Sequence, residues 1–242
     1  MRKISRLNSL IEALKSSPSR VNKIFIQRDL KNKKIAEILK LAKAGHVPVH
    51  FVPRERIDRF DRGHQGVAAL VSPKEFSNVD EILSSSDVPL LILLDGIEDP
   101  QNLGAIIRTA EGAGVDGVIL PERRSAGLTE AVSSVSAGAL EYIRVARVKN
   151  LARTMDDLKD RGLWLVGAES GQDEHWCEFD YSVPVGLVLG SEGKGLRPLI
   201  RKKCDKILSI PLLGRITSLN VSAAAAVFLF EVVRQRKSKK IE

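Results

Sequence analysis

Residues 90–96 read Leu-Leu-Ile-Leu-Leu-Asp-Gly, an apolar run that no polar residue interrupts before Asp95. A strand with one wet face would alternate polar and apolar residues, so a continuous run is typical of a strand buried on both faces of a parallel sheet. Strand and helix patterns then alternate to the C-terminus, which predicts a parallel α/β sheet. The expected strands are 90–96, 118–120, 142–148, 163–168, 185–190 and 206–211, and the expected helices are 102–113, 127–135, 150–161, 196–203 and 220–236.

The chain before Pro89 follows a different pattern. It predicts two helices, at 9–15 and at 33–45, and strands at 21–27, 46–52 and 66–72. From Pro73 to Pro89 the composition turns to Ser, Asp and Asn with one weak helix pattern. We therefore expect a small α/β domain over residues 1–73, a linker over 74–88 and the parallel-sheet domain over 89–242.

Positive charge is concentrated in the first domain. The 242 residues carry 38 Lys+Arg against 30 Asp+Glu, a net charge of +8. Residues 1–80 hold 17 basic and 8 acidic residues, whereas residues 81–233 hold 16 and 21, and the tail 234–242 is basic again. A lysine-rich face can be merely solvated, but a basic module beside a mildly acidic body favours a nucleic-acid partner.

Several protein classes are excluded by composition. Hydrophobic residues make up 43% of the chain, enough for a core, yet no apolar run reaches the ~18 residues of a membrane span. The N-terminus has no apolar stretch of the signal-peptide kind, and Cys177 and Cys204 form neither a disulfide framework nor a zinc set. We expect a soluble cytoplasmic protein with no membrane partner.

Two glycine clusters imitate nucleotide-binding motifs. Residues 112–117 spell G-x-G-x-x-G, but they follow a helix and precede a strand, the reverse of the dinucleotide fingerprint, so we interpret them as a helix end and turn. Residues 190–195, Gly-Ser-Glu-Gly-Lys-Gly, lack the spacing and the final hydroxyl of a phosphate-binding P-loop. Glycines directly after a buried strand allow close backbone approach, so this loop is either a turn or a ligand loop.

Two further segments carry small polar residues at expected helix starts. Ser218 and Asn220 lie at the entry of the last helix and are good N-caps, and Asn102 could cap the helix that carries Arg108. Arg108 lies among apolar residues, where its side chain could reach along the surface to solvent or hold a phosphate or carboxylate. His46 and His50 have helical metal spacing, but Pro48 between them favours a strand, and we predict no metal site.

Taken together, three segments resemble the SpoU (TrmH) family of RNA ribose 2′-O-methyltransferases, in the SPOUT class. These are DGIEDPQNLGAIIRTAE, LVLGSEGKGLRP and IPLLGRITSLNVSAAAAVFLFE. Further resemblance in EALKSSPSRVNKIFIQ, HQGVAALVSP and SSVSAGALEYIRVARVKNLA points to the branch that methylates a guanosine in large-subunit ribosomal RNA. The resemblance implies a parallel-sheet domain with a deep trefoil knot, preceded by a small ribosomal-protein-like RNA-binding domain, and a homodimer with each active site near the subunit interface.

The resemblance also implies the cofactor and the site. S-adenosylmethionine, with no metal, is expected on Gly190, Glu192, Gly193, Ile210, Leu212, Ser218, Leu219 and Asn220. Arg108 is expected at the centre of catalysis, with Asn102, Glu192, Ser218 and Asn220 positioning the ribose, the cofactor and Arg108. Arginine keeps its proton in proteins, so orienting a phosphate and stabilising negative charge suits Arg108 better than acting as a base.

Two other functions stay open at this point. The same chemistry could act on transfer RNA or on another ribosomal site, including sites that confer antibiotic resistance. The chain could also be a non-catalytic RNA-binding factor in ribosome assembly, and failure to bind S-adenosylmethionine would favour that alternative.

Overall fold

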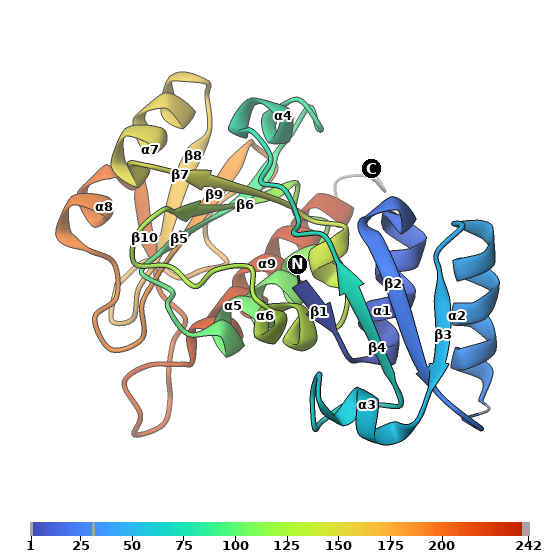
Figure 1. Cartoon of the computed structure of the whole chain (residues 1–242). Coiled ribbons are helices and arrows are strands. Elements are labelled where there is room, and N and C mark those ends of the chain that lie inside the picture. The colour runs from blue at the N-terminus through green and yellow to red at the C-terminus, as the bar shows by residue number, and fades with distance from the viewer. Residues whose placement is uncertain (1, 31, 239–242) are drawn as a thin grey trace. The chain divides into compact units, whose positions relative to one another are not determined.

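The computed structural model describes residues 2–30 and 32–238, and the chain forms two units (Figure 1). Unit 1 comprises Met1–Glu75 together with Gly127–Tyr142, and unit 2 comprises Phe76–Ala126 together with Ile143–Glu242. Residues 239–242, which carry part of the basic tail, lie outside the described residues.

Unit 1 is a four-stranded sheet with helices on both faces. The strand order is β1 (Arg2–Ile4), β4 (Val67–Val71), β2 (Val21–Gln27) and β3 (Val49–Val52), with β2 and β3 parallel and the other pairs antiparallel. One face, with Ile24 and Ile26, packs against α1 (Leu7–Ser16) and α2 (Lys33–Ala44). The opposite face packs against the short helix α3 (Arg54–Asp58) through Ile57.

A segment from much later in the chain completes unit 1. Residues 127–142 contain α6 (Glu130–Val135) and the 3-10 turn η2 (Ala139–Glu141). The Glu141 carboxylate is 1% exposed and accepts hydrogen bonds from the guanidinium groups of Arg2 and Arg20, the latter at 3.0 Å. Buried charges are tolerated only when paired, so this cluster ties the segment to both β1 and the 3-10 turn η1 (Pro18–Arg20).

Unit 2 is a six-stranded sheet in which every pair of neighbours is parallel. The order is β10 (Lys206–Leu208), β8 (Trp164–Ala168), β9 (Val185–Gly190), β5 (Leu90–Asp95), β6 (Gly117–Pro121) and β7 (Arg144–Val148). The central strands β5 and β9 are buried along their whole length, which explains their uninterrupted apolar sequences.

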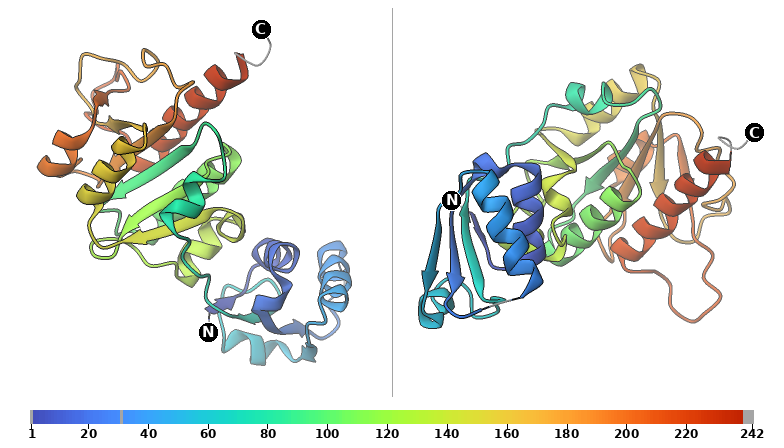
Figure 2. Two further views of the ribbon diagram at one scale, coloured as in Figure 1. Left: turned by 90° about the horizontal axis from the view of Figure 1, so that it is seen from above. Right: turned by 90° about the vertical axis from the view of Figure 1, so that its right-hand side faces the viewer.

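Helices cover both faces of this sheet (Figure 2). On one face, α4 (Val79–Leu83), α7 (Leu151–Asp160) and α8 (Pro198–Lys203) pack into a single apolar cluster with the strands. On the other face, α5 (Pro100–Gly112) and α9 (Val221–Ser238) pack against each other. None of the helices in the described part of the chain has the length and apolarity to cross a membrane.

The α/β architecture with a parallel-sheet core is confirmed, and the knot stays a prediction. Gly114 has φ 72° and follows Ala113, the C-cap of α5, as expected for the helix end and turn at 112–117. The prediction that Asn102 could cap α5 is wrong, because Asp99 is the cap, accepting from the backbone N–H of Gln101 at 3.0 Å, and Pro100 is the first helical residue. The short elements β1 and α3 were not predicted.

Candidate active site

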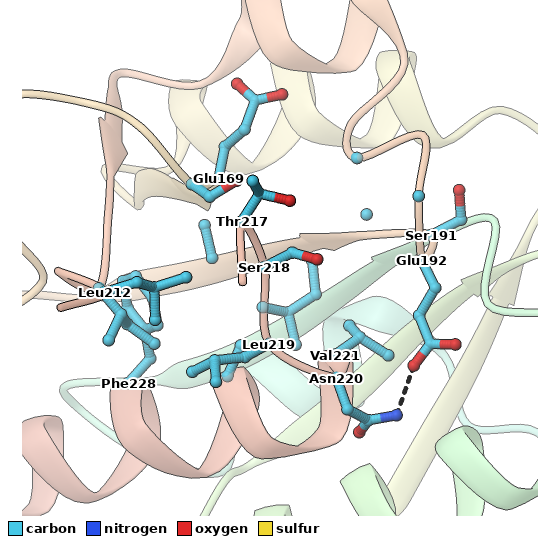
Figure 3. A pocket seen from close by; sticks show the side chains of 18 residues that line it. Glu169, Ser191, Glu192, Leu212, Thr217, Ser218, Leu219, Asn220, Val221 and Phe228 are labelled. Carbon is cyan, nitrogen blue, oxygen red and sulfur yellow. Dashed lines mark hydrogen bonds between the residues drawn. The ribbon is translucent and has the colours of Figure 1, made fainter. Parts of the chain in front are cut away.

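A cavity of about 630 Å³ opens in unit 2 at the carboxyl ends of β8 and β9 (Figure 3). Ligands of parallel α/β sheets bind at this edge, because the loops that follow the strands meet there. Residues from 168–170, 189–195, 210–212 and 217–221 line the cavity. All eight residues expected to hold the cofactor are among them, namely Gly190, Glu192, Gly193, Ile210, Leu212, Ser218, Leu219 and Asn220.

The cavity has an apolar side and a polar side. Figure 3 shows Leu212, Leu219 and Phe228 on one side and Glu192 with Asn220 on the other. The apolar side suits a flat ring system, and the carboxylate of Glu192 suits a cationic group. The arrangement is therefore suited to a ligand that carries both.

The conformation of the loop after β9 requires glycine at position 190. Ser191 and Gly195 pair across it through hydrogen bonds of 3.2 and 2.9 Å, and Gly193 at its tip has φ 76°. A Cβ atom on Gly190 would lie 2.2 Å from the carbonyl carbon of Gly195 and 2.4 Å from the nitrogen of Leu196. Only glycine allows the strand end and the returning loop to lie this close.

Asn220 links two other expected catalytic residues, Asn102 and Glu192. Its Oδ1 accepts from the backbone N–H of Ser222 at 2.9 Å, so it caps α9. Its Nδ2 donates to Asn102 Oδ1 at 2.9 Å and also to the carboxylate of Glu192. The hydrogen bond that caps α9 fixes the orientation of the Asn220 amide. The same orientation points Nδ2 toward Asn102 and Glu192.

Arg108 and Ser218 stand apart from this network. Ser218 lines the cavity and is exposed, whereas Arg108 is exposed on α5 and is not a lining residue. Six residues separate Arg108 from Asn102, a rotation of about 240° around a helix, so the two side chains leave α5 in different directions. The described residues give Arg108 no hydrogen-bond or ion-pair partner, and its guanidinium is open to a substrate group.

An ion pair behind the cavity was not predicted. Asp95, the last residue of β5, has a fully buried carboxylate that accepts from the backbone N–H of Arg197 at 2.9 Å and from its Nε at 2.7 Å. Arg197 directly follows the glycine loop and precedes α8. The sequence offered one signal, an acid that ends an apolar run, but its partner lies 102 residues away.

We expect Asp95→Asn to loosen the start of α8 and the adjacent loop. The substitution keeps the shape of the side chain but removes the charge that holds the Arg197 guanidinium, which should lower the free energy of unfolding by about 2 kcal/mol. Urea unfolding measures this change. Asp80→Asn, which removes an exposed partner of Arg161, is the control and should cost less than about 1 kcal/mol. Equal losses in the two variants would contradict the assignment.

Two further lining residues, Glu169 and Thr217, were also missed. Glu169 extends from the end of β8, and its carboxylate accepts from Nε of Arg201 at 2.7 Å.

Within residues 2–30 and 32–238, no three His, Cys, Asp or Glu side chains gather in a way that could hold a metal ion. Burial raises the pKa of the Cys204 thiol to about 12, which leaves little thiolate at neutral pH.

Two family models match the chain. The SpoU rRNA Methylase family matches residues 89–230, which include the whole cavity lining. The model described as RNA 2′-O ribose methyltransferase substrate binding matches residues 7–77, most of unit 1.

Curated relatives match over almost the full length. A protein of Staphylococcus saprophyticus, named for the TrmH family of tRNA/rRNA methyltransferases, is 45% identical over 89% of both chains. The Bacillus subtilis protein YacO, named for the same family, is 40% identical over 95% of this chain and 94% of its own.

Solved structures agree with this assignment. The SpoU methyltransferase AviRb from Streptomyces viridochromogenes has a TM-score of 0.83 at 26% identity, covering 98% of this chain and 90% of its own. AviRb was also solved in complex with the cofactor AdoMet, S-adenosylmethionine, with a TM-score of 0.82. The A. aeolicus TrmH/SpoU tRNA modifying enzyme covers 66% of this chain and 82% of its own, with a TM-score of 0.59 and 30% identity. The chain therefore belongs to the SpoU rRNA methylase family and is an RNA methyltransferase of the SpoU/TrmH type.

Proposed function

We propose that the protein transfers a methyl group from S-adenosylmethionine to the ribose 2′-hydroxyl of a guanosine in large-subunit ribosomal RNA. The observation that carries this proposal is the cavity in which eight expected cofactor residues meet, with Asn220 linking Glu192 to Asn102. Unit 1, with its surplus of positive charge, supports an RNA substrate.

The cavity suits S-adenosylmethionine chemically. The adenine ring matches the apolar side formed by Leu212, Leu219 and Phe228, and the bare backbone at Gly190 and Gly193 allows polar groups of the ligand to reach peptide groups. Glu192 supplies the negative charge that a sulfonium cation prefers. When bound, the cofactor supplies a methyl group already activated by its sulfonium.

The protein's own side chains would orient the ribose. A ribose hydroxyl is a weak nucleophile near neutral pH, so methyl transfer requires its alignment and the removal of its proton. The Asn220 amide, held by the α9 cap, keeps Glu192 and Asn102 in fixed positions. Arg108, open to solvent, would hold an RNA phosphate and stabilise the negative charge that develops on the ribose oxygen.

Transfer RNA is the second candidate substrate, because the names of the curated relatives include both tRNA and rRNA. Incubation with methyl-labelled S-adenosylmethionine and either RNA separates the two. Label in large-subunit ribosomal RNA supports the proposal, and label in transfer RNA alone contradicts the target. If calorimetry detects no binding of S-adenosylmethionine, the methyltransferase proposal itself fails in favour of a non-catalytic assembly factor.

We further propose a homodimer that acts in the cytoplasm, where ribosomal RNA is assembled into subunits. Phe230 on α9 is 53% exposed, and a large apolar side chain on a helix surface is suited to contact with a second copy. Sedimentation of the unaltered protein and of Phe230→Glu tests this, and two monomeric species would contradict the dimer.

A further inference from the structure

The face of the unit 1 sheet that turns away from α1 and α2 carries a regular set of cationic and planar side chains. Lys3 and Lys23 both lie opposite Leu70, so the three residues form one row across β1, β4 and β2. Phe25 lies opposite Ala68 and His50, which gives the next row across β4, β2 and β3. Cross-strand neighbours share a face, so all six residues belong to one surface, which we name the α3 face.

The charge of the α3 face is positive. Its strand residues include no Asp or Glu within the described strands β1 to β4. Arg56 of α3 adds a guanidinium, 5.6 Å from the centroid of the Phe25 ring, and the Lys3 ammonium lies 5.4 Å from the centroid of Phe60. Two strand spacings separate Lys3 from Lys23, about 10 Å, so their ammonium groups can contact different phosphates of one RNA strand.

Of the acidic groups that border the α3 face, Asp58 and Asp61 have other partners, whereas Glu55 of α3 is exposed beside Arg56. Asp58 lies 2.9 Å from Nε2 of His64, and Asp61 accepts from the hydroxyl of Ser5 at 2.5 Å. Glu130 lines a cavity of about 390 Å³ together with Lys3, at the β1 edge of the sheet, and burial raises the pKa of its carboxyl. The middle of the face, from Lys23 to His50, carries no carboxylate on its strands.

Planar groups distinguish this face from an ordinary basic surface. The His50 ring is exposed and lies 5.9 Å from the Phe25 ring, and Phe60 continues the series at 5.2 Å from Phe25. Phe25 itself is buried beneath Arg56, so the surfaces offered to a ligand are the His50 ring and the Arg56 guanidinium. Unstacked RNA bases stack on both kinds of group, whereas a duplex keeps its bases stacked inside.

We propose that the α3 face, through Lys3, Lys23, His50 and Arg56, is the surface on which unit 1 binds single-stranded RNA. The inference rests on the proposed function, in that the substrate is RNA, and it adds which side of the unit carries the contact. The helix side of unit 1 provides a matched comparison, because Lys33, Lys40 and Lys43 lie exposed on α2 with equal charge.

Binding of a fluorescein-labelled single-stranded RNA of mixed sequence, measured by anisotropy over a range of KCl concentrations, tests the proposal. The full-length variant Lys3→Gln/Lys23→Gln/Arg56→Gln should bind at least ten-fold more weakly at low salt. The slope of log K against log salt should fall by about 2, since each phosphate contact on a single strand contributes about 0.7. The control Lys33→Gln/Lys40→Gln/Lys43→Gln should keep the slope of the unaltered protein.

A second pair of variants tests the stacking contribution. His50→Ala should weaken binding about ten-fold at every salt concentration without changing the slope, and His50→Phe should retain affinity. Lys23→Gln alone, a minimal change on a strand, covers the case in which the triple variant unfolds. Equal losses in the α3-face and α2 variants, or a loss only in the α2 variant, would overturn the proposal, as would equal binding of a duplex of the same sequence.

The outcomes are separable from failure of the proposed function. Calorimetric binding of S-adenosylmethionine, which uses unit 2, should be the same in every variant. If the unaltered protein methylates RNA and the α3-face variant keeps full RNA affinity, only the surface assignment is wrong. If the unaltered protein transfers no methyl group to any RNA, the proposed function is wrong.

Discussion

Arg108→Ala should reduce methyl transfer at least about 100-fold while changing the affinity for S-adenosylmethionine by no more than a few-fold. Methyl transfer and cofactor affinity should respond differently because Arg108 is exposed on α5 and does not line the cavity. Removing a group that stabilises charge only in the transition state costs about 10²–10³ in rate. Single-turnover kinetics and calorimetry on the same preparations measure both quantities.

Two other arginine variants sharpen this test. Arg108→Lys keeps the positive charge but loses the planar fork that binds phosphate at two points, so it should recover only part of the rate. Arg153→Ala removes an exposed arginine from α7, away from the cavity lining, and should leave turnover unchanged. Near-normal turnover in Arg108→Ala would remove Arg108 from the mechanism.

Gly190→Ala should abolish binding of S-adenosylmethionine, with at least about a 100-fold loss of affinity. The added Cβ would lie 2.2 Å from the carbonyl carbon of Gly195 and 2.3 Å from its oxygen, both backbone atoms that cannot move aside without opening the loop. Opening the loop moves Glu192, and with it the contact to Asn220. Calorimetry with the cofactor measures the loss directly.

Gly112→Ala is the matched control for this substitution. Gly112 is the last residue of α5, and a Cβ atom there would have nothing within 4 Å. The variant should bind the cofactor as the unaltered protein does, and helix propensity favours alanine there. If Gly190→Ala binds the cofactor normally, the close approach of Gly190 and Gly195 is not needed for the site.

The sheet of unit 2 could be predicted because its signal is local. The central strands β5 and β9 are short runs of apolar residues, and the run at 90–96 became β5, buried throughout. The helix starts were less accessible, since Asp99, Asn102 and Pro100 all favour a helix N-terminus and only the fold shows which of them caps it. Three residues, Arg2–Ile4, form β1 by pairing with β4. So short a segment has no periodic sequence pattern that would predict a strand.

Long-range charge pairs were the least predictable features. Segment 127–142 belongs to unit 1 through Glu141, whose partners Arg2 and Arg20 lie 139 and 121 residues earlier. Asp95 and Arg197 are likewise remote in sequence. In the site, the resemblance to the family predicted eight of the residues that line the cavity. Glu169 and Thr217 also line it, but they belong to no sequence motif from which this could be predicted.

The most direct test of the central claim is mass mapping of large-subunit ribosomal RNA after incubation with the protein and methyl-labelled S-adenosylmethionine. We predict one labelled guanosine whose ribose carries the methyl group, which also makes the adjacent phosphodiester resistant to alkali because the 2′-hydroxyl is blocked. Label on a base, or label that appears only in transfer RNA, would contradict the account.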